Sequence, residues 1–202
     1  MNIYLRMIIV LTSIGLISGL FLAGVGTLTK ERIALNKQRE INEAIIRVVP
    51  GTIASQKLYE ERSLSIFEGR DENNNLIGYA VYTAGVGFQD KIYLMVGLDP
   101  EISKIYSLTI IDQKETPGLG GKITSQKDFL QFWENKDCTQ PLRLHKPAVS
   151  SPQELSPSEV NTITGATVSS EAVVNMVNDS LTMIRDLKKE GKLDREVRNG
   201  QQ

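Results

Sequence analysis

The chain has very little of what metal and haem sites in proteins are made from. Among its 202 residues there is one cysteine, Cys138, and one histidine, His145. A single cysteine excludes an internal disulfide, and the chain has no cysteine and histidine cluster that would hold zinc, haem iron or an iron–sulfur centre. Neither residue has a neighbour in sequence that would activate it. We therefore expect no metal site and no catalytic side chain.

A strong excess of charge of one sign is also absent. The 23 lysines and arginines are balanced by 24 aspartates and glutamates, which leaves a formal net charge of −1. This balance argues against a basic nucleic-acid-binding protein. The sequence also has no Walker-type or dinucleotide-binding glycine loop, so the common nucleotide-binding folds are not indicated.

A long apolar run stands at the start of the chain. Met7 to Thr29 contains no charged residue over 23 positions. As a helix this run would be about 34 Å long, enough to cross a hydrocarbon core of about 30 Å. The alternative is a cleaved signal peptide, but its apolar part usually has about 7–15 residues, and no clear cleavage site precedes Lys30. We expect residues 1–29 to form a single-pass membrane anchor.

The side of the membrane on which the rest of the chain lies is harder to derive. Arg6 precedes the apolar run, whereas Lys30, Arg32, Lys37 and Arg39 follow it closely. A simple count of these charges places the following domain in the cytoplasm. The positive-inside rule weakens when a long folded domain follows the span, so charge alone leaves the orientation open.

The remainder of the chain indicates an α+β domain in which helices cover an antiparallel sheet. Residues 30–51 predict a juxtamembrane helix that Pro50 and Gly51 end. Short connections between β-like runs favour an antiparallel meander. The predicted strands are Leu64–Glu68, Leu76–Thr83, Ile92–Leu98 and Ile105–Asp112, and the predicted covering helices are Ser125–Asn135 and Ser169–Lys188. We expect the domain to occupy residues 52–188, and the charged residues 189–202 to be a flexible tail.

The most informative motif is Thr164-Gly165-Ala166-Thr167, which continues with Val168 and Ser169. The apolar residues that follow recur at helical spacing, which places Thr167 in the first turn of the last helix. The first N–H groups of a helix have no partner within it and lie at the positive end of its dipole, so they bind phosphate. The alternative interpretation is an ordinary capped helix after a turn, because Ser, Thr and Gly are common at such places.

Two further glycine-rich segments could approach a ligand closely. Glu115-Thr116-Pro117-Gly118-Leu119-Gly120-Gly121 follows the fourth predicted strand, and Gly85–Asp90 lies between the second and third. Glycine permits backbone conformations that bring the main chain close to a planar ligand. Plain surface turns have a similar composition, and each segment alone does not decide between the two.

In this order, the apolar run, the two glycine-rich segments and the tetrad resemble the FMN-binding-domain family of respiratory flavoprotein subunits. Within it, the chain resembles the G subunits of Rnf-type ion-translocating electron-transport complexes. The C subunits of the sodium-translocating NADH:quinone reductase carry related motifs but are typically longer. The resemblance implies a membrane-anchored redox subunit that relays electrons through FMN among the other subunits of a membrane complex.

The resemblance also implies how the flavin is held. In this family the last threonine of the tetrad, here Thr167, carries FMN through a phosphoester bond, and Thr164, Gly165, Ala166, Val168 and Ser169 surround it. We expect Thr116 and the backbone of Gly118, Leu119 and Gly120 to contact the ring, with Glu115 a further contact. The bond requires a separate enzyme, implied to be an ApbE-type flavin transferase that acts outside the cytoplasm, which places the domain on the exterior side. The family usually has Asp where this chain has Asn161, and we expect Asn to be tolerated.

Other functions are compatible with the same residues. One is a membrane-anchored binding or assembly module whose tetrad only caps a helix and which carries no flavin. Another is the quinone-reductase C subunit or a flavin-dependent regulator built on the same domain.

Overall fold

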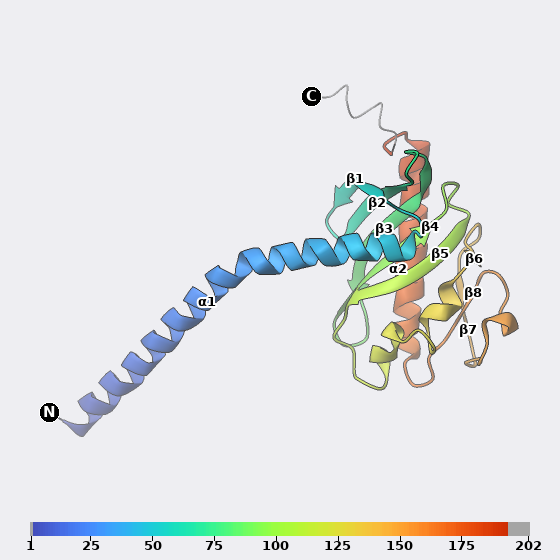
Figure 1. Cartoon of the computed structure of the whole chain (residues 1–202). Helices are drawn as coiled ribbons and strands as arrows, with labels where there is room; N and C mark the ends of the chain where they lie inside the picture. Colours follow the sequence, from blue (N-terminus) through green and yellow to red (C-terminus); the bar gives the residue numbers. More distant parts are fainter. Residues whose placement is uncertain (1, 194–202) are drawn as a thin grey trace. The chain divides into compact units, whose positions relative to one another are not determined.

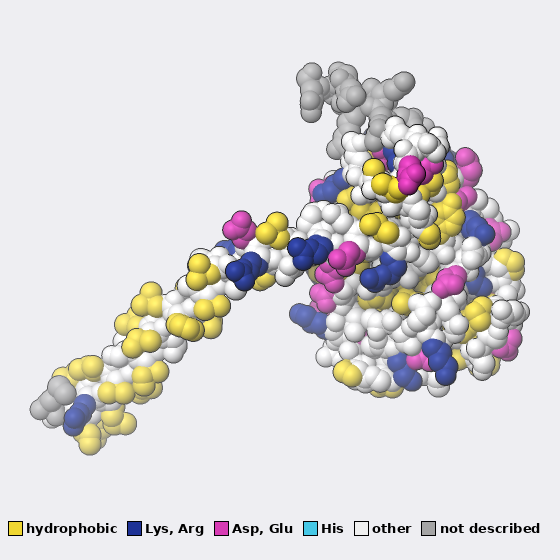
Figure 2. All heavy atoms as spheres, viewed as in Figure 1, with side chains coloured by type: hydrophobic (Ala, Val, Ile, Leu, Met, Phe, Trp, Pro, Cys, Tyr) yellow, Lys and Arg dark blue, Asp and Glu magenta, His cyan; other side chains and the backbone are white. Residues whose placement is uncertain are grey.

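The computed structural model describes residues 2–193, and the chain divides at Ile41/Asn42 into two units that we describe separately. The first unit belongs to one α-helix, α1 (Ile3–Val48), which confirms the helix predicted for both the apolar run and the segment after it. The apolar side chains of the first part of α1 are exposed (Figure 2). By its length and composition this helix is able to cross a membrane. The part of the predicted tail from residue 194 onward lies outside the described residues.

The second unit is built on a six-stranded antiparallel sheet with the strand order β1-β2-β3-β4-β5-β6 (Figure 1). Each strand pairs with the next one along the chain, so the predicted meander is confirmed. All four predicted strands are present in it, as β2 to β5. The strands are β1 (Ala54–Glu61), β2 (Leu64–Arg70), β3 (Leu76–Val86), β4 (Lys91–Leu98), β5 (Lys104–Asp112) and β6 (Lys136–Asp137).

Four strands were not predicted from the sequence. β1 is an edge strand in which only Leu58 is buried, so it has no alternation of apolar and polar residues to reveal it. β6 has two residues, and a separate parallel pair is formed by β7 (Arg143–His145) and β8 (Glu159–Asn161). Strands of two or three residues are too short to carry a periodic signal.

One face of the sheet packs against the C-terminal helix α2 (Thr167–Lys189). Val81 of β3 lies opposite Val96 of β4, and both side chains are fully buried on this face. Val173 and Val177 of α2 belong to the same apolar core. Burial of the periodic apolar face of α2 confirms the predicted covering helix and fixes the position of its N-terminus relative to the sheet.

The other face is covered by the end of α1, within the second unit. Ala44, Ile45 and Val48 are buried there, and the hydroxyl of Ser107 on β5 donates to the carbonyl of Arg47 at 3.4 Å. Gly97 of β4 is the point of closest approach, because a Cβ at this position would overlap the carbonyl oxygen of Val48. The sheet is thus buried on both faces.

The predicted helix Ser125–Asn135 was wrong in its geometry. The segment forms turns and one short 3-10 helix, η2 (Leu130–Trp133), and Asn135 ends it with a positive φ of 59°. Its three aromatic rings, those of Phe129, Phe132 and Trp133, are nevertheless buried as a helical face would be. Burial of these rings decides the local backbone here, and helix propensity is overridden.

Candidate functional site

The candidate site begins at the N-terminus of α2. The N-cap is Ala166, and no side chain caps the helix, so the interpretation of the tetrad as an ordinary capped helix is not supported. The first amide bonded within the helix is that of Ser170, which donates to Ala166 O at 3.0 Å. The amides of Thr167 to Ser169 precede it and have no acceptor within the helix. These are the groups that hold an anion at a helix start.

The turn before the helix is held by its own hydrogen bonds. Gly165 has a φ of +83°, a conformation that disfavours any other residue. The Ala166 amide donates to Ile163 O at 2.9 Å. The buried hydroxyl of Ser170 accepts from the Ile163 amide at 3.2 Å and donates to Ala166 O at 3.0 Å. The sequence therefore specifies both the shape of the turn and the direction in which the helix starts.

A cavity of about 280 Å³ lies against this helix start. Its lining contains all of the predicted site residues except Thr164 and Gly118. It consists of Phe88, Glu115, Thr116, Leu119, Gly120, Gly165, Ala166, Thr167, Val168 and Ser169. Thr164 lines a different cavity on the other side of the turn, and Gly118 is an exposed turn residue with a φ of +78°. Segments that are far apart in sequence thus meet at one place.

Glu115 joins the three segments that make the cavity. Its side chain is buried, and its Oε2 accepts a hydrogen bond of 2.6 Å from the Ser169 hydroxyl on α2. Its Oε1 accepts the backbone N–H of Gln89 at 3.0 Å. The Thr116 hydroxyl donates to Gln89 Oε1 at 2.9 Å. A buried carboxylate needs such donors to compensate for lost hydration, and these bonds fix the loop after β5 against both α2 and the Gly85–Asp90 loop.

The rim of the cavity is apolar and open. Phe88 is 70% exposed, Val168 55% and Leu119 48%. Phe88 was not among the predicted site residues, although the loop that carries it was recognised as a possible ligand loop. The signal that could have identified it is a lone aromatic residue in a glycine-bearing loop. Large apolar side chains held in solvent beside a cavity are typical of a surface that covers a ligand or a partner.

The donor set and the rim together fit an FMN. The uncapped helix start suits its phosphate, and the apolar rim suits the flat face of its ring. The cavity volume is slightly below the range of about 300–1,000 Å³ that encloses ligands of drug size. It would therefore hold part of an FMN and leave the rest accessible.

Asn161, three residues before the tetrad, has a structural task. Its Oδ1 accepts the Val149 amide at 2.9 Å and its Nδ2 donates to the Val149 carbonyl at 3.0 Å. The side chain is buried. It therefore pairs with the backbone as a strand residue would, and it ties β8 to the preceding connection.

Cys138 and His145 lie outside the lining of this cavity. Cys138 is completely buried, and burial raises the pKa of its thiol to about 11, so the thiol stays protonated and unreactive at neutral pH. His145 lies 3.5 Å from a carboxylate oxygen of Glu159. Within residues 2–193 no three carboxylate, histidine or cysteine side chains come together as a metal site would require.

Comparison with known proteins supports a flavin domain at this place. A family model described as an FMN-binding domain matches residues 87–182, which include every segment of the cavity. The G subunit of the ion-translocating oxidoreductase complex of Pasteurella multocida is 30% identical over 197 residues, covering 90% of this chain and 94% of that protein. The corresponding G subunit of Methanosarcina acetivorans is 24% identical over 186 residues, covering 89% of this chain and 93% of that protein.

A solved structure has the same fold. The crystal structure of NqrC from Shewanella oneidensis matches this chain with a TM-score of 0.52 at 21% sequence identity. The match covers 65% of this chain and 66% of that one.

Proposed function

We propose that this chain, a member of the G-subunit family of Rnf-type ion-translocating oxidoreductase complexes, relays electrons through FMN. It carries an FMN-binding domain and an N-terminal apolar helix. In this proposal the flavin is bound by a phosphoester to Thr167, and α1 anchors the chain in the membrane beside the other subunits of the complex. The observation that carries the covalent site is the uncapped start of α2, whose first residue is Thr167.

The geometry around Thr167 supports a phosphate at its hydroxyl. Thr167 is the first helical residue, so a phosphoryl group on its side chain would lie beside the free amides of the first turn. Those amides and the helix dipole stabilise negative charge without a basic side chain. Thr164 lines the other cavity and is not a helical residue, so its hydroxyl lacks this environment.

The protein's task toward the bound flavin is to orient it and to limit its contact with water. FMN itself supplies the electron-transfer chemistry. The buried Glu115 holds the Thr116 to Gly120 loop in place through Ser169 and Gln89. Phe88, Leu119 and Val168 provide apolar contact for the ring. No side chain of the protein needs to act as an acid or base for this task.

Formation of the bond needs a partner enzyme. A threonine hydroxyl is a weak nucleophile, and phosphoryl transfer to it requires activation and neutralisation of charge, commonly by a metal ion. We propose an ApbE-type flavin transferase for this step, with FAD as the donor. Such a transferase acts outside the cytoplasm, so the proposal places the domain on the exterior side of the cell membrane. A C-terminal fusion to alkaline phosphatase tests the orientation, because that enzyme is active only when exported.

The central test is intact-mass spectrometry of the full-length protein after coexpression with the transferase. We expect the wild-type mass to increase by that of FMN less one water, and we expect Thr167→Ala to lack the increase. Thr164→Ala is the matched control, because it removes a neighbouring hydroxyl that lies outside the cavity, and it should remain fully modified.

Other outcomes would support other functions. An unmodified wild-type protein, with the transferase active on a second substrate, would leave an anchored assembly module or a non-covalent flavin protein. If the Thr167→Ala variant is still modified and the Thr164→Ala variant is not, the attachment site is Thr164. Assignment to an Rnf-type complex, rather than to a quinone reductase, is tested by copurification of the tagged chain with its neighbouring subunits.

A further inference from the structure

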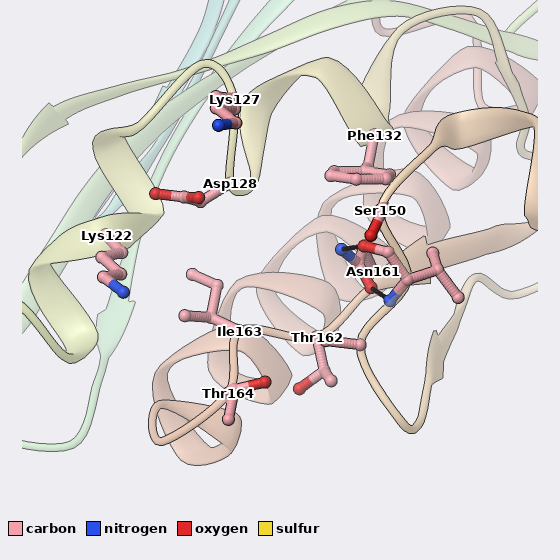
Figure 3. A pocket seen from close by; sticks show the side chains of 11 residues that line it. Lys122, Lys127, Asp128, Phe132, Ser150, Asn161, Thr162, Ile163 and Thr164 are labelled. Carbon is pink, nitrogen blue, oxygen red and sulfur yellow. Dashed lines mark hydrogen bonds between the residues drawn. The ribbon is translucent and has the colours of Figure 1, made fainter.

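The carboxylate of Glu115 is a buried charge in the wall of the cavity at the start of α2. The residue is 4% exposed. Within residues 2–193, no lysine, arginine or histidine nitrogen lies within 4 Å of its oxygens. The described lining of the cavity also contains no cationic side chain. Lys122, from the loop that follows Glu115, lines the other cavity before α2 (Figure 3). Neutral donors alone therefore hold the negative charge of Glu115.

These neutral donors keep the carboxylate at one position in the cavity wall. The Ser169 hydroxyl donates to Oε2 at 2.6 Å, and the Gln89 amide donates to Oε1 at 3.0 Å. Gly87 and Gly120 lie against the same two oxygens, because a Cβ at either position would overlap one of them. A side chain at either glycine would therefore displace the carboxylate. The charge has a defined place relative to anything that occupies the cavity.

The structural task of Glu115 does not require a charge. A glutamine has the same shape, and its oxygen would accept from the Gln89 amide while its nitrogen donates to the Ser169 hydroxyl. Burial of a carboxylate without a cation costs free energy that burial of an amide does not. A neutral residue would thus join the same segments at lower cost, and the charge itself needs another explanation.

Building on the flavin function proposed above, on which this step rests, we propose that the charge of Glu115 lowers the reduction potential of FMN in the cavity. When oxidised flavin takes up one electron from a reduced carrier, the carrier is oxidised by one electron and no bond forms or breaks. The charge of the flavin becomes more negative by one. A fixed negative charge in the cavity wall opposes this change. The reduced flavin is then a stronger electron donor than it is beside a neutral residue.

The size of the cavity makes the effect measurable. A sphere with its volume of about 280 Å³ is about 8 Å across. Over that distance, at an effective dielectric constant of about 20, a unit charge changes a one-electron equilibrium by more than about tenfold. The open rim of the cavity admits water, which weakens the interaction. We therefore expect a change of about tenfold, which equals about 59 mV for one electron.

Redox titration of the full-length, detergent-solubilised protein after coexpression with the transferase tests this effect. Dithionite supplies the electrons, and the flavin absorbance is followed against dyes of known potential. We expect Glu115→Gln to raise the midpoint potential by about 59 mV, the tenfold change in the one-electron equilibrium. Glu115→Asp retains the charge and should raise the potential by less than half as much.

Two controls separate the charge from the hydrogen bonds and from the surface. Ser169→Ala loses the same hydrogen bond as Glu115→Gln weakens but keeps the carboxylate, so its potential should not rise. Glu171→Gln makes the same chemical change in the first turns of α2, at a side chain that is 56% exposed. Water screens that charge, so the potential of this variant should change much less.

Intact-mass spectrometry of the same samples separates failure of this proposal from failure of the flavin function. A wild-type protein without flavin would refute the flavin function, and this proposal with it. Equal potentials of the flavin-loaded wild type and Glu115→Gln would overturn this proposal alone. A rise in Ser169→Ala as large as that in Glu115→Gln would overturn it too, because a loosened loop rather than the charge would then set the potential.

Discussion

The hydrogen bond between Ser169 and Glu115 should stabilise the second unit measurably. Its length is 2.6 Å, it is buried, and its acceptor is a carboxylate. Hydrogen bonds to charged groups contribute about 1.5–3 kcal/mol. We therefore expect Ser169→Ala to destabilise the unit by about 2 kcal/mol, which lowers the melting temperature by about 4–8 °C for a unit of this size.

Tryptophan fluorescence is the assay for this prediction, and a second buried serine of α2 provides the control. Trp133 is the only tryptophan and is completely buried, so its fluorescence follows unfolding of the second unit. Ser180→Ala is the matched control, because Ser180 is buried on the same helix but donates to its own helix, at Met176 O. Loss of that bond is offset by the higher helix propensity of alanine, so its effect should be below about 1 kcal/mol.

A double-mutant cycle with Glu115→Gln isolates the contact. The two substitutions should be strongly non-additive, since each removes part of the same interaction. Equal destabilisation by Ser169→Ala and Ser180→Ala would refute the reasoning. Simple additivity of Ser169→Ala and Glu115→Gln would refute it as well.

Three further predictions concern packing, titration and the residue before the tetrad. Gly97→Ala should lower the free energy of unfolding by more than about 3 kcal/mol, measured by urea denaturation, because its Cβ would overlap the backbone of Val48. Gly85→Ala should lower it much less, because its Cβ would meet the flexible Met176 side chain. Burial raises the pKa of the Cys138 thiol from 9.0 to about 11. Its contribution to the free energy of unfolding should therefore be complete below pH 9 and be lost as the pH rises to 11. Unfolding midpoints that fall equally for wild type and Cys138→Ala over this range would contradict it. Asn161→Asp should lower the melting temperature, since a carboxylate cannot donate to Val149 O, and an unchanged melting temperature would exclude this role.

The elements with a strong apolar pattern were predictable from the sequence. β3 and β4 are nearly continuous buried runs rich in β-branched and aromatic residues, and the helical spacing of Val173 and Val177 reflects one buried face of α2, so their types and approximate bounds follow from burial. The exposed edge strand β1 lacks such a face and was missed. The segment around Phe132 has the apolar spacing of a helix, but it buries those residues through turns and a short 3-10 helix.

The candidate site was predictable in its parts and not in its assembly. The tetrad and the loop at Glu115 were recognised because glycine and hydroxyl residues cluster there. The bond that joins them spans 54 positions, and no local pattern shows that Ser169 and Glu115 are partners. Phe88 was missed although it is the lone aromatic residue of its loop, since only the fold brings it beside the tetrad and the loop at Glu115.

The hydrogen bonds of Glu115 to Gln89 and Ser169 have a consequence for the order in which the protein folds and receives its cofactor. The carboxylate meets Gln89 and Ser169 only after β5 has joined the sheet and α2 has docked. A newly made chain therefore carries the tetrad before it has a cavity. If Thr167 is modified only in its folded surroundings, the coloured cofactor becomes a mark of completed folding, and immature chains would enter the membrane complex colourless or not at all.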